Sequence, residues 1–232
     1  MSALYVVRIP VVIPRLLRFA FEQDIRQEEE GLGYSLHVWL AALFGRAAPK
    51  PFRFFERTSE LLAYSPLSHT ELLERAQAFA PALAWSALEA EGAASKPMPA
   101  CWRVGQRLRA EALVCPVSRV DNDEKDVYLR ALDREGAQAA PRAAVYSQWF
   151  IAQWKGAVHF EHVQLLGMTS RSRMLRRARN GANRLRVVER PQALFGADVE
   201  IADPERFAAL LARGIGRHRA FGFGMILLSP RP

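Results

Sequence analysis

The chain has 232 residues, half of them hydrophobic, and a formal net charge of +8. This length and apolar content allow two domains with separate cores and exclude a largely disordered chain. No apolar run approaches the roughly twenty residues of a membrane helix, and the apolar N-terminus lacks the charged start and cleavage site of a signal peptide.

The first part of the chain alternates strand-like and helix-like segments. Residues 3–13 are β-branched and apolar, which predicts a strand interrupted at Pro10. Residues 34–45 place leucines at helical spacing and end in glycine, which predicts a helix. The other segments are a helical or extended insertion at 14–33, two strands with a turn at 50–65, and a helix up to Pro81 that begins with a capping signature at Ser68 or Thr70. The order β-α-β-β-α is that of a ferredoxin-like half.

A stretch at 89–100 that is rich in glycine, alanine and proline predicts a link between domains at 1–95 and 96–232. Beyond it, the patterns predict a strand at 101–119, helices at 124–136 and 142–157, a strand from 158, and a further strand from 194. A helix capped by Asp203, a glycine-rich loop at 214–224 and a last strand complete the chain. The expected fold is therefore α+β, with tandem ferredoxin-like (RRM-like) domains.

Most of the positive charge is arginine, whose forked donors bind phosphate and whose plane stacks on bases. This excess predicts a polyanionic partner such as nucleic acid, with coding bias and plain solubility as the alternative. The two cysteines, Cys101 and Cys115, have no metal-ligand spacing. We expect them to be reduced in a cytoplasmic protein, with a single disulfide as the alternative.

The densest basic segment, 171–190, holds eight arginines and one acid. Such a block repels itself and usually binds nucleic acid, as a hairpin or a helical finger, although a merely flexible loop is the alternative. The candidate RNA-binding residues of this basic finger are Arg171, Arg173, Arg176, Arg177, Arg179, Arg184 and Arg186. Arg107 and Arg109 join them from the strand at 101–119.

The glycine-rich loop at 214–224 offers a second candidate interface. Gly214 and Gly216 allow close backbone approach, and Arg217 and His218 add charge beside free N–H groups, a combination that suits phosphate. A dinucleotide-binding fingerprint is the alternative, but that motif follows a strand and opens a helix, whereas this loop follows a helix and precedes a strand.

Tyr34 and His37 stand three residues apart on the helix predicted at 34–45, and hence on one face. Histidine titrates near neutral pH and is a common general acid or base, while a structural role is the alternative for an isolated histidine. No acidic cluster suggests magnesium and no Cys/His set suggests zinc, so we expect neither a metal nor a cofactor.

The chain resembles the repeat-RNA processing endoribonucleases of CRISPR systems, in particular the CasE type. Four segments carry the resemblance: YSLH at 34–37, VGQRLRAEALVCP at 104–116, LFGADVEIADPERFAALLARGIG at 194–216 and RHRAFGFGMILLSP at 217–230. Their order and spacing agree over essentially the whole chain. The arginine block and the acidic insertion EQDIRQEEEG leave a relative from type IV systems as a second possibility within this group.

This resemblance implies metal-independent cleavage of the repeat hairpin of precursor crRNA. The 2′-hydroxyl attacks the adjacent phosphate, and the products carry a 2′,3′-cyclic phosphate and a 5′-hydroxyl. It implies His37 as general acid or base, Tyr34 as an orienting group, and Arg26 or Arg219 against the transition-state charge, or arginines in place of His37. The implied partners are the repeat hairpin, the mature crRNA and other subunits of a multisubunit effector complex. Two alternatives remain: a catalytically inactive guide-RNA-binding subunit, and a basic structural protein of ribosomal type.

Overall fold

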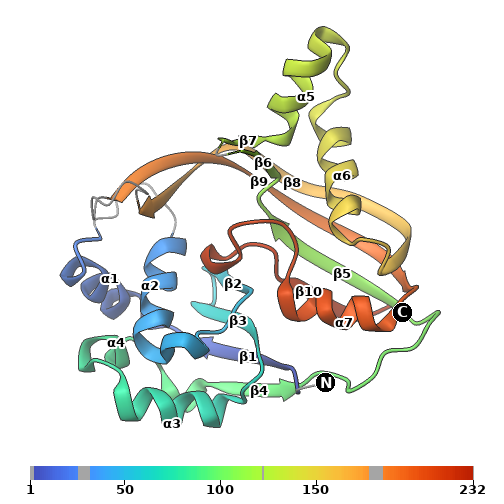
Figure 1. Cartoon of the computed structure of the whole chain (residues 1–232). Coiled ribbons are helices and arrows are strands. Elements are labelled where there is room, and N and C mark those ends of the chain that lie inside the picture. Colours follow the sequence, from blue (N-terminus) through green and yellow to red (C-terminus); the bar gives the residue numbers. More distant parts are fainter. Residues whose placement is uncertain (1–2, 26–31, 122, 178–184, 232) are drawn as a thin grey trace. The chain divides into compact units, whose positions relative to one another are not determined.

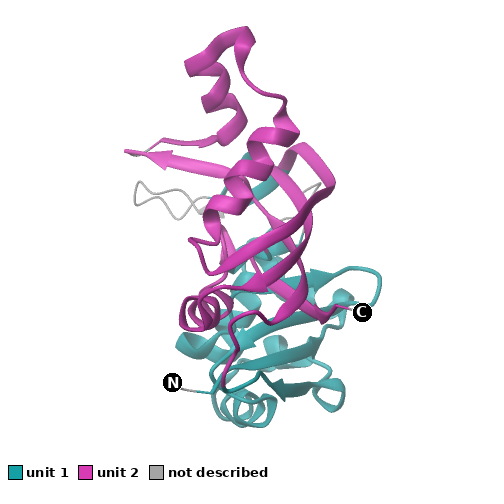
Figure 2. Ribbon diagram, turned by 90° about the vertical axis from the view of Figure 1, so that its right-hand side faces the viewer, with its two compact units in different colours: residues 1–100, 173–189, 220–222 teal, residues 101–172, 190–219, 223–232 magenta. Residues whose placement is uncertain are grey.

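A computed structural model of the chain describes residues 3–25, 32–121, 123–177 and 185–231 (Figure 1). The chain divides into two compact units, coloured separately in Figure 2. Unit 1 consists of residues 1–100, 173–189 and 220–222, and unit 2 of residues 101–172, 190–219 and 223–232. Each unit is built around one four-stranded antiparallel sheet.

The sheet of unit 1 has the order β2-β3-β1-β4. Its strands are β1 (Tyr5–Pro10), β2 (Phe52–Phe55), β3 (Glu60–Ser65) and β4 (Ala94–Pro97). Residues 94–97 belong to the stretch expected to be a link between domains, and for them that prediction is wrong. They pair antiparallel with β1, with Val7 opposite Ser95. A short strand that ends in proline is tolerated here because β4 lies at the sheet edge.

The helices of unit 1 pack their apolar side chains on this sheet. They are α1 (Ile13–Glu22), α2 (Gly33–Phe44), α3 (His69–Phe79) and α4 (Ala82–Ser86), with short 3₁₀ helices η1 (Gly45–Ala47) and η2 (Ala90–Gly92). The predicted cap of α3 is confirmed at Ser68, whose amide donates to the Glu71 carboxylate at 2.8 Å while its hydroxyl accepts from the Glu71 amide. Trp39 is fully buried, and its indole N–H donates to the Ala84 carbonyl at 2.9 Å.

The sheet of unit 2 has the order β10-β5-β9-β8. Its strands are β5 (Arg107–Val114), β8 (Val158–Arg177), β9 (Leu185–Ile201) and β10 (Ile226–Pro230). Residues 173–189, where β8 ends and β9 begins, group with unit 1. In both four-stranded sheets, the strand that comes first along the chain lies between the third and fourth strands of that sheet. The predicted α+β class with two ferredoxin-like halves is confirmed.

Unit 2 contains the helices α5 (Val127–Glu135), α6 (Arg142–Gln153) and α7 (Pro204–Arg213), and the short 3₁₀ helix η3 (Gly136–Gln138). A further 3₁₀ helix, η4 (Arg219–Phe221), begins at the last residue of this part of unit 2. Residues 220–222, within and after η4, group with unit 1. The Asp203 side chain caps α7 by accepting from the Arg206 amide at 3.0 Å, as predicted. Phe150 of α6 stacks on Phe195 of β9 with 4.4 Å between ring centroids, which fixes this helix on the sheet.

The strand predicted over 101–119 is interrupted. It breaks after Val114 because Cys115 and Pro116 leave the sheet, and the chain then forms a separate hairpin of β6 (Val117–Val120) and β7 (Asp123–Asp126). Within the described ranges, no helix is long and apolar enough to cross a membrane.

Candidate active site

The first turn of α2 brings Tyr34 and His37 together. Their ring centroids are 6.2 Å apart in an edge-to-face arrangement, as expected for two aromatic side chains three residues apart on a helix. Tyr34 is only 6% exposed, whereas His37 is partly exposed. The predicted pair thus presents the imidazole, and not the phenol ring, to solvent.

Phe221 adds a third ring to this pair, from the opposite end of the sequence. Its ring stacks on Tyr34 at 6.0 Å with an interplanar angle of 12°, and its centroid lies 5.0 Å from that of His37. All three residues belong to unit 1, because residues 220–222 group with it. We call Tyr34, His37 and Phe221 the aromatic triad.

Gly33 allows this close approach. A β-carbon at Gly33 would lie 2.7 Å from the backbone oxygen of Phe221, closer than van der Waals contact permits. The glycine before Tyr34 is therefore required for packing. Sequence reasoning singled out the tyrosine and the histidine that follow it but gave Gly33 no role.

The environment of His37 favours the neutral imidazole. Burial lowers the pKa of His37 from its ordinary value, and the nearby positive charge of Lys50 lowers this pKa further. At neutral pH the ring is uncharged and has a lone pair that can accept a proton. This is the form that a general base needs.

In unit 2, the loop residues Arg217 and His218 bind an acid that sequence reasoning missed. The Glu124 carboxylate of β7 accepts from Arg217 Nε at 2.6 Å and pairs with His218 Nε2 at 2.9 Å, and Arg190 Nε donates to it at 2.9 Å. His218 is 9% exposed and has a left-handed backbone with φ 60°. We call Glu124, Arg190, Arg217 and His218 the Glu124 cluster.

Burial alone would raise the pKa of Glu124. His218, Arg217 and Arg190 outweigh that effect and lower the pKa to about 2. The carboxylate is therefore charged over the physiological pH range, and it ties Arg217 and His218 of the loop to Arg190 of β9. Gly214 and Gly216 both have positive φ, and a β-carbon at Gly216 would lie 2.9 Å from the Trp149 ring.

Arg219 also belongs to unit 2, and its guanidinium donates to the Arg213 carbonyl at 2.8 Å. Burial lowers its pKa, and Arg213 and Arg217 lower it further. The other arginine expected to act in catalysis, Arg26, lies outside the described residues.

The remaining candidate RNA-binding residues that the structure describes lie on the strands of the second sheet. Arg107 of β5 is exposed and pairs with Glu161 at 3.1 Å and with Glu200 at 3.3 Å, while Arg109 is exposed two residues further on. On the finger, Arg171 and Arg186 are exposed and Arg173 is half-buried. Arg176 and Arg177 are the last residues of β8, and Arg179 and Arg184 lie outside the described residues. Within the described residues, no group of three His, Cys, Asp or Glu side chains could hold a metal ion.

The family model described as "CRISPR associated protein" matches residues 13–230. The CRISPR-associated endoribonuclease Cse3 of Thermus thermophilus is 29% identical over 150 residues, which is 63% of this chain and 68% of that protein. The structure of CRISPR endoribonuclease Cse3 bound to a 19 nt RNA matches with a TM-score of 0.64 at 21% identity, over 99% of this chain and all of that one. A chain of a CRISPR RNA-guided surveillance complex in a pre-nicking state matches with a TM-score of 0.57 at 18% identity, over 99% of this chain and all of that one.

Proposed function

The chain belongs to the family of CRISPR-associated proteins, and from this premise we propose that it is an endoribonuclease that matures CRISPR RNA. It cuts the repeat hairpin of precursor crRNA without a metal ion, and it stays bound to the mature crRNA. The proposal is supported by the likeness to a protein named as an endoribonuclease and by the fold of an RNA-bound chain. Because its substrate is a transcript, the protein acts in the cytoplasm.

The observation that carries the chemistry is the neutral, partly exposed imidazole of His37 beside two aromatic rings. It accepts the proton of the ribose 2′-hydroxyl as the 2′-oxygen attacks the adjacent phosphorus. The P–O5′ bond breaks, the upstream fragment ends in a 2′,3′-cyclic phosphate, and the leaving 5′-oxygen takes up a proton. Because Tyr34 is buried, it orients the imidazole through ring contact and is a positioning residue.

We propose that Arg219 offsets the negative charge of the five-coordinate phosphate. Arg171, Arg173 and Arg186 of the finger, with Arg107 and Arg109 of β5, bind the phosphates of the hairpin stem. The other subunits of a CRISPR effector complex are its protein partners, a proposal that the fold shared with a surveillance-complex chain supports.

The test is cleavage of the repeat RNA in EDTA, under single-turnover conditions and across pH 5 to 8. We expect one cut, which is lost when the nucleotide at the cut carries a 2′-deoxyribose and reduced at least a hundredfold in His37→Ala. The lowered pKa of His37 keeps the base form populated below pH 6.5, so the wild-type rate falls only under more acidic conditions. His69→Ala is the matched control, because His69 belongs to the same unit and bonds Ser95 Oγ at 2.9 Å.

One observation favours a second candidate function, that of a catalytically inactive guide-RNA-binding subunit. Phe221 lies against both rings of the predicted pair, and Tyr34 is 6% exposed. Because Tyr34 is buried, His37 is the one member of the pair that can contact RNA, and a catalytic pair is not presented to the substrate. Tight binding of the repeat RNA by the wild type without any cut would support this candidate and contradict the proposed nuclease activity. If His37→Ala cleaves at the wild-type rate, the protein is still a nuclease, but the catalytic groups are arginines and not His37.

A further inference from the structure

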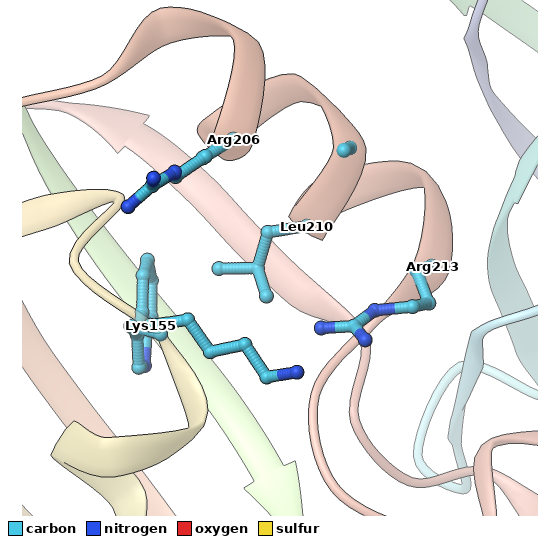
Figure 3. A pocket seen from close by; sticks show the side chains of 6 residues that line it. Lys155, Arg206, Leu210 and Arg213 are labelled. Carbon is cyan, nitrogen blue, oxygen red and sulfur yellow. The ribbon is translucent and has the colours of Figure 1, made fainter.

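Unit 2 contains a pocket of about 510 Å³ that none of the predicted site residues line. Its lining residues are Trp154, Lys155, Arg206, Ala209, Leu210 and Arg213. The first two follow the end of α6 and the other four lie on α7, so the pocket opens along most of that helix (Figure 3). Its volume is that of a small-ligand site.

The pocket concentrates positive charge. Three of the six lining residues are cations, and none of the six is an acid. Figure 3 shows the side chains of Lys155 and Arg213 extending toward each other below Leu210. Two like charges that converge repel one another, and an anion between them would remove that repulsion.

Two of these cations differ from ordinary surface residues in their backbone or in their pairing. Lys155 has a left-handed backbone with φ 50°, which is uncommon for a residue with a long side chain. Arg206 is anchored at the rim, because its Nε lies 3.1 Å from Asp203 Oδ2. The cations at the pocket are thus placed by the fold on a strained turn and on a capped helix.

The remaining lining residues are apolar. Ala209 of α7 is exposed, whereas Leu210 and Trp154 are 3% and 1% exposed and form the floor behind it. Trp154 packs edge-to-face against Phe150 and Phe160 at 5.8 and 5.5 Å, so this floor is rigid. An apolar lining with a few charged groups is typical of small-ligand sites.

We propose that this pocket binds one unpaired nucleotide of RNA, with the phosphate between Lys155 and Arg213 and the ribose or base beside Ala209 of α7. The choice of RNA rests on the function proposed above. An unpaired nucleotide fits because its base is free to enter a pocket together with its phosphate, whereas a base in an A-form stem is stacked inside the helix. The occupant is therefore the single-stranded part of the transcript that flanks the hairpin.

The first experiment measures binding of fluorescein-labelled hexauridylate by anisotropy. We expect Lys155→Gln/Arg213→Gln to bind at least tenfold more weakly than the wild type. The matched control, Arg75→Gln/Arg134→Gln, removes the same charge from exposed positions elsewhere and should change affinity less than twofold. Equal losses of affinity in the two double variants would contradict nucleotide binding in the pocket, because the binding would then depend only on net charge.

Two further measurements fix the chemistry of the site. Lys155→Arg/Arg213→Lys keeps both charges and should retain affinity within threefold of the wild type, which separates charge from a folding defect. Uridine monophosphate and inorganic phosphate are tested as competitors at constant ionic strength, and each should need at least a hundredfold higher concentration than unlabelled hexauridylate. Displacement by either one as readily as by the oligonucleotide would overturn RNA as the occupant.

The outcome is separable from that of the proposed function. A repeat hairpin trimmed of its single-stranded flanks should be cut by Lys155→Gln/Arg213→Gln within twofold of the wild-type rate. If the wild type binds hexauridylate through the pocket but cuts no hairpin, the nuclease fails and the nucleotide site stands. If it cuts the hairpin but the pocket variant binds hexauridylate like the control, the nucleotide site fails alone.

Discussion

At the residue scale, Glu124 organises the basic loop that precedes β10. Its side chain is 6% exposed and contacts two arginines, Arg190 and Arg217, and the His218 imidazole. Two of these were expected to bind phosphate. In the structure they are already paired with a carboxylate, so a phosphate reaching them competes with Glu124 for the same donors.

We expect Glu124→Gln to lower the free energy of unfolding at pH 7 by about 2 kcal/mol, because it leaves Arg190 and Arg217 without the buried anion that pairs with them. The pKa of Glu124 lies near 2 in the folded protein, below the 4.5 of a free glutamate. The carboxylate therefore stabilises the fold fully above about pH 5, and that stabilisation fades as the pH falls from 4.5 toward 2. Urea unfolding at several pH values should show the variant and the wild type converging over this acidic range.

Glu135→Gln is the control, since its exposed carboxylate lies 3.8 Å from Arg134 and such surface pairs contribute little. It should change the free energy of unfolding by less than about 0.5 kcal/mol at any of these pH values. A deficit of Glu124→Gln that stays constant down to pH 2 would contradict the ionic role and indicate a packing defect.

At the element scale, the start of α2 depends on Gly33. A methyl group there meets the backbone oxygen of Phe221 at 2.7 Å, and a backbone atom has no rotamer by which to move away. We expect Gly33→Ala to destabilise unit 1 by about 1–3 kcal/mol, the usual cost of overpacking, and to push Phe221 off the rings of Tyr34 and His37. The measurements are the melting temperature and the single-turnover cleavage rate, and both should fall.

Gly167→Ala provides the comparison, because a β-carbon at Gly167 has no neighbour within 4 Å and this glycine has no positive φ. It should leave both quantities near their wild-type values. Wild-type cleavage by Gly33→Ala would show that the position of Phe221 does not matter to catalysis.

Elements with strong local signals were predictable from the sequence. The capped helices α3 and α7 begin where Ser68 and Asp203 indicated, because a cap is made by residues close in sequence. The edge strand β4 was missed because Ser95, Lys96 and Pro97 have no strand propensity, and their strand geometry comes from pairing with β1. The β6–β7 hairpin was missed because residues 112–117 form a continuous apolar run, and the break that Pro116 makes in this run was included in a single strand.

The part of the candidate site that is encoded locally was also predictable from the sequence. Helical spacing placed Tyr34 and His37 on one face. Their contact with Phe221 and the pairing of Glu124 with Arg217 join segments far apart in the chain, and no local pattern encodes them. The neutral state of His37 likewise comes from burial, which a single sequence does not specify.

At the scale of the whole molecule, the excess of positive charge sets how RNA binding responds to salt. The formal net charge is +8. Arg171 and Arg186 of the finger and Arg107 and Arg109 of β5 are exposed on strands, and Arg173 is half-buried. Each phosphate they neutralise releases condensed counterions, so the logarithm of affinity falls linearly with the logarithm of salt concentration. The slope of this line is proportional to the number of phosphates that the protein contacts.

We expect affinity for the repeat hairpin to fall by about two orders of magnitude between 50 and 200 mM salt, which corresponds to about five phosphate contacts. Arg171→Gln/Arg173→Gln should reduce the magnitude of the log–log slope by about 1.5, because each lost contact removes about 0.7 to 0.9. Arg75→Gln/Arg134→Gln removes the same charge away from the finger and should leave the slope unchanged. Equal slopes in the two double variants would mean that the finger does not contact phosphate, and that the net charge of the molecule alone draws RNA to it.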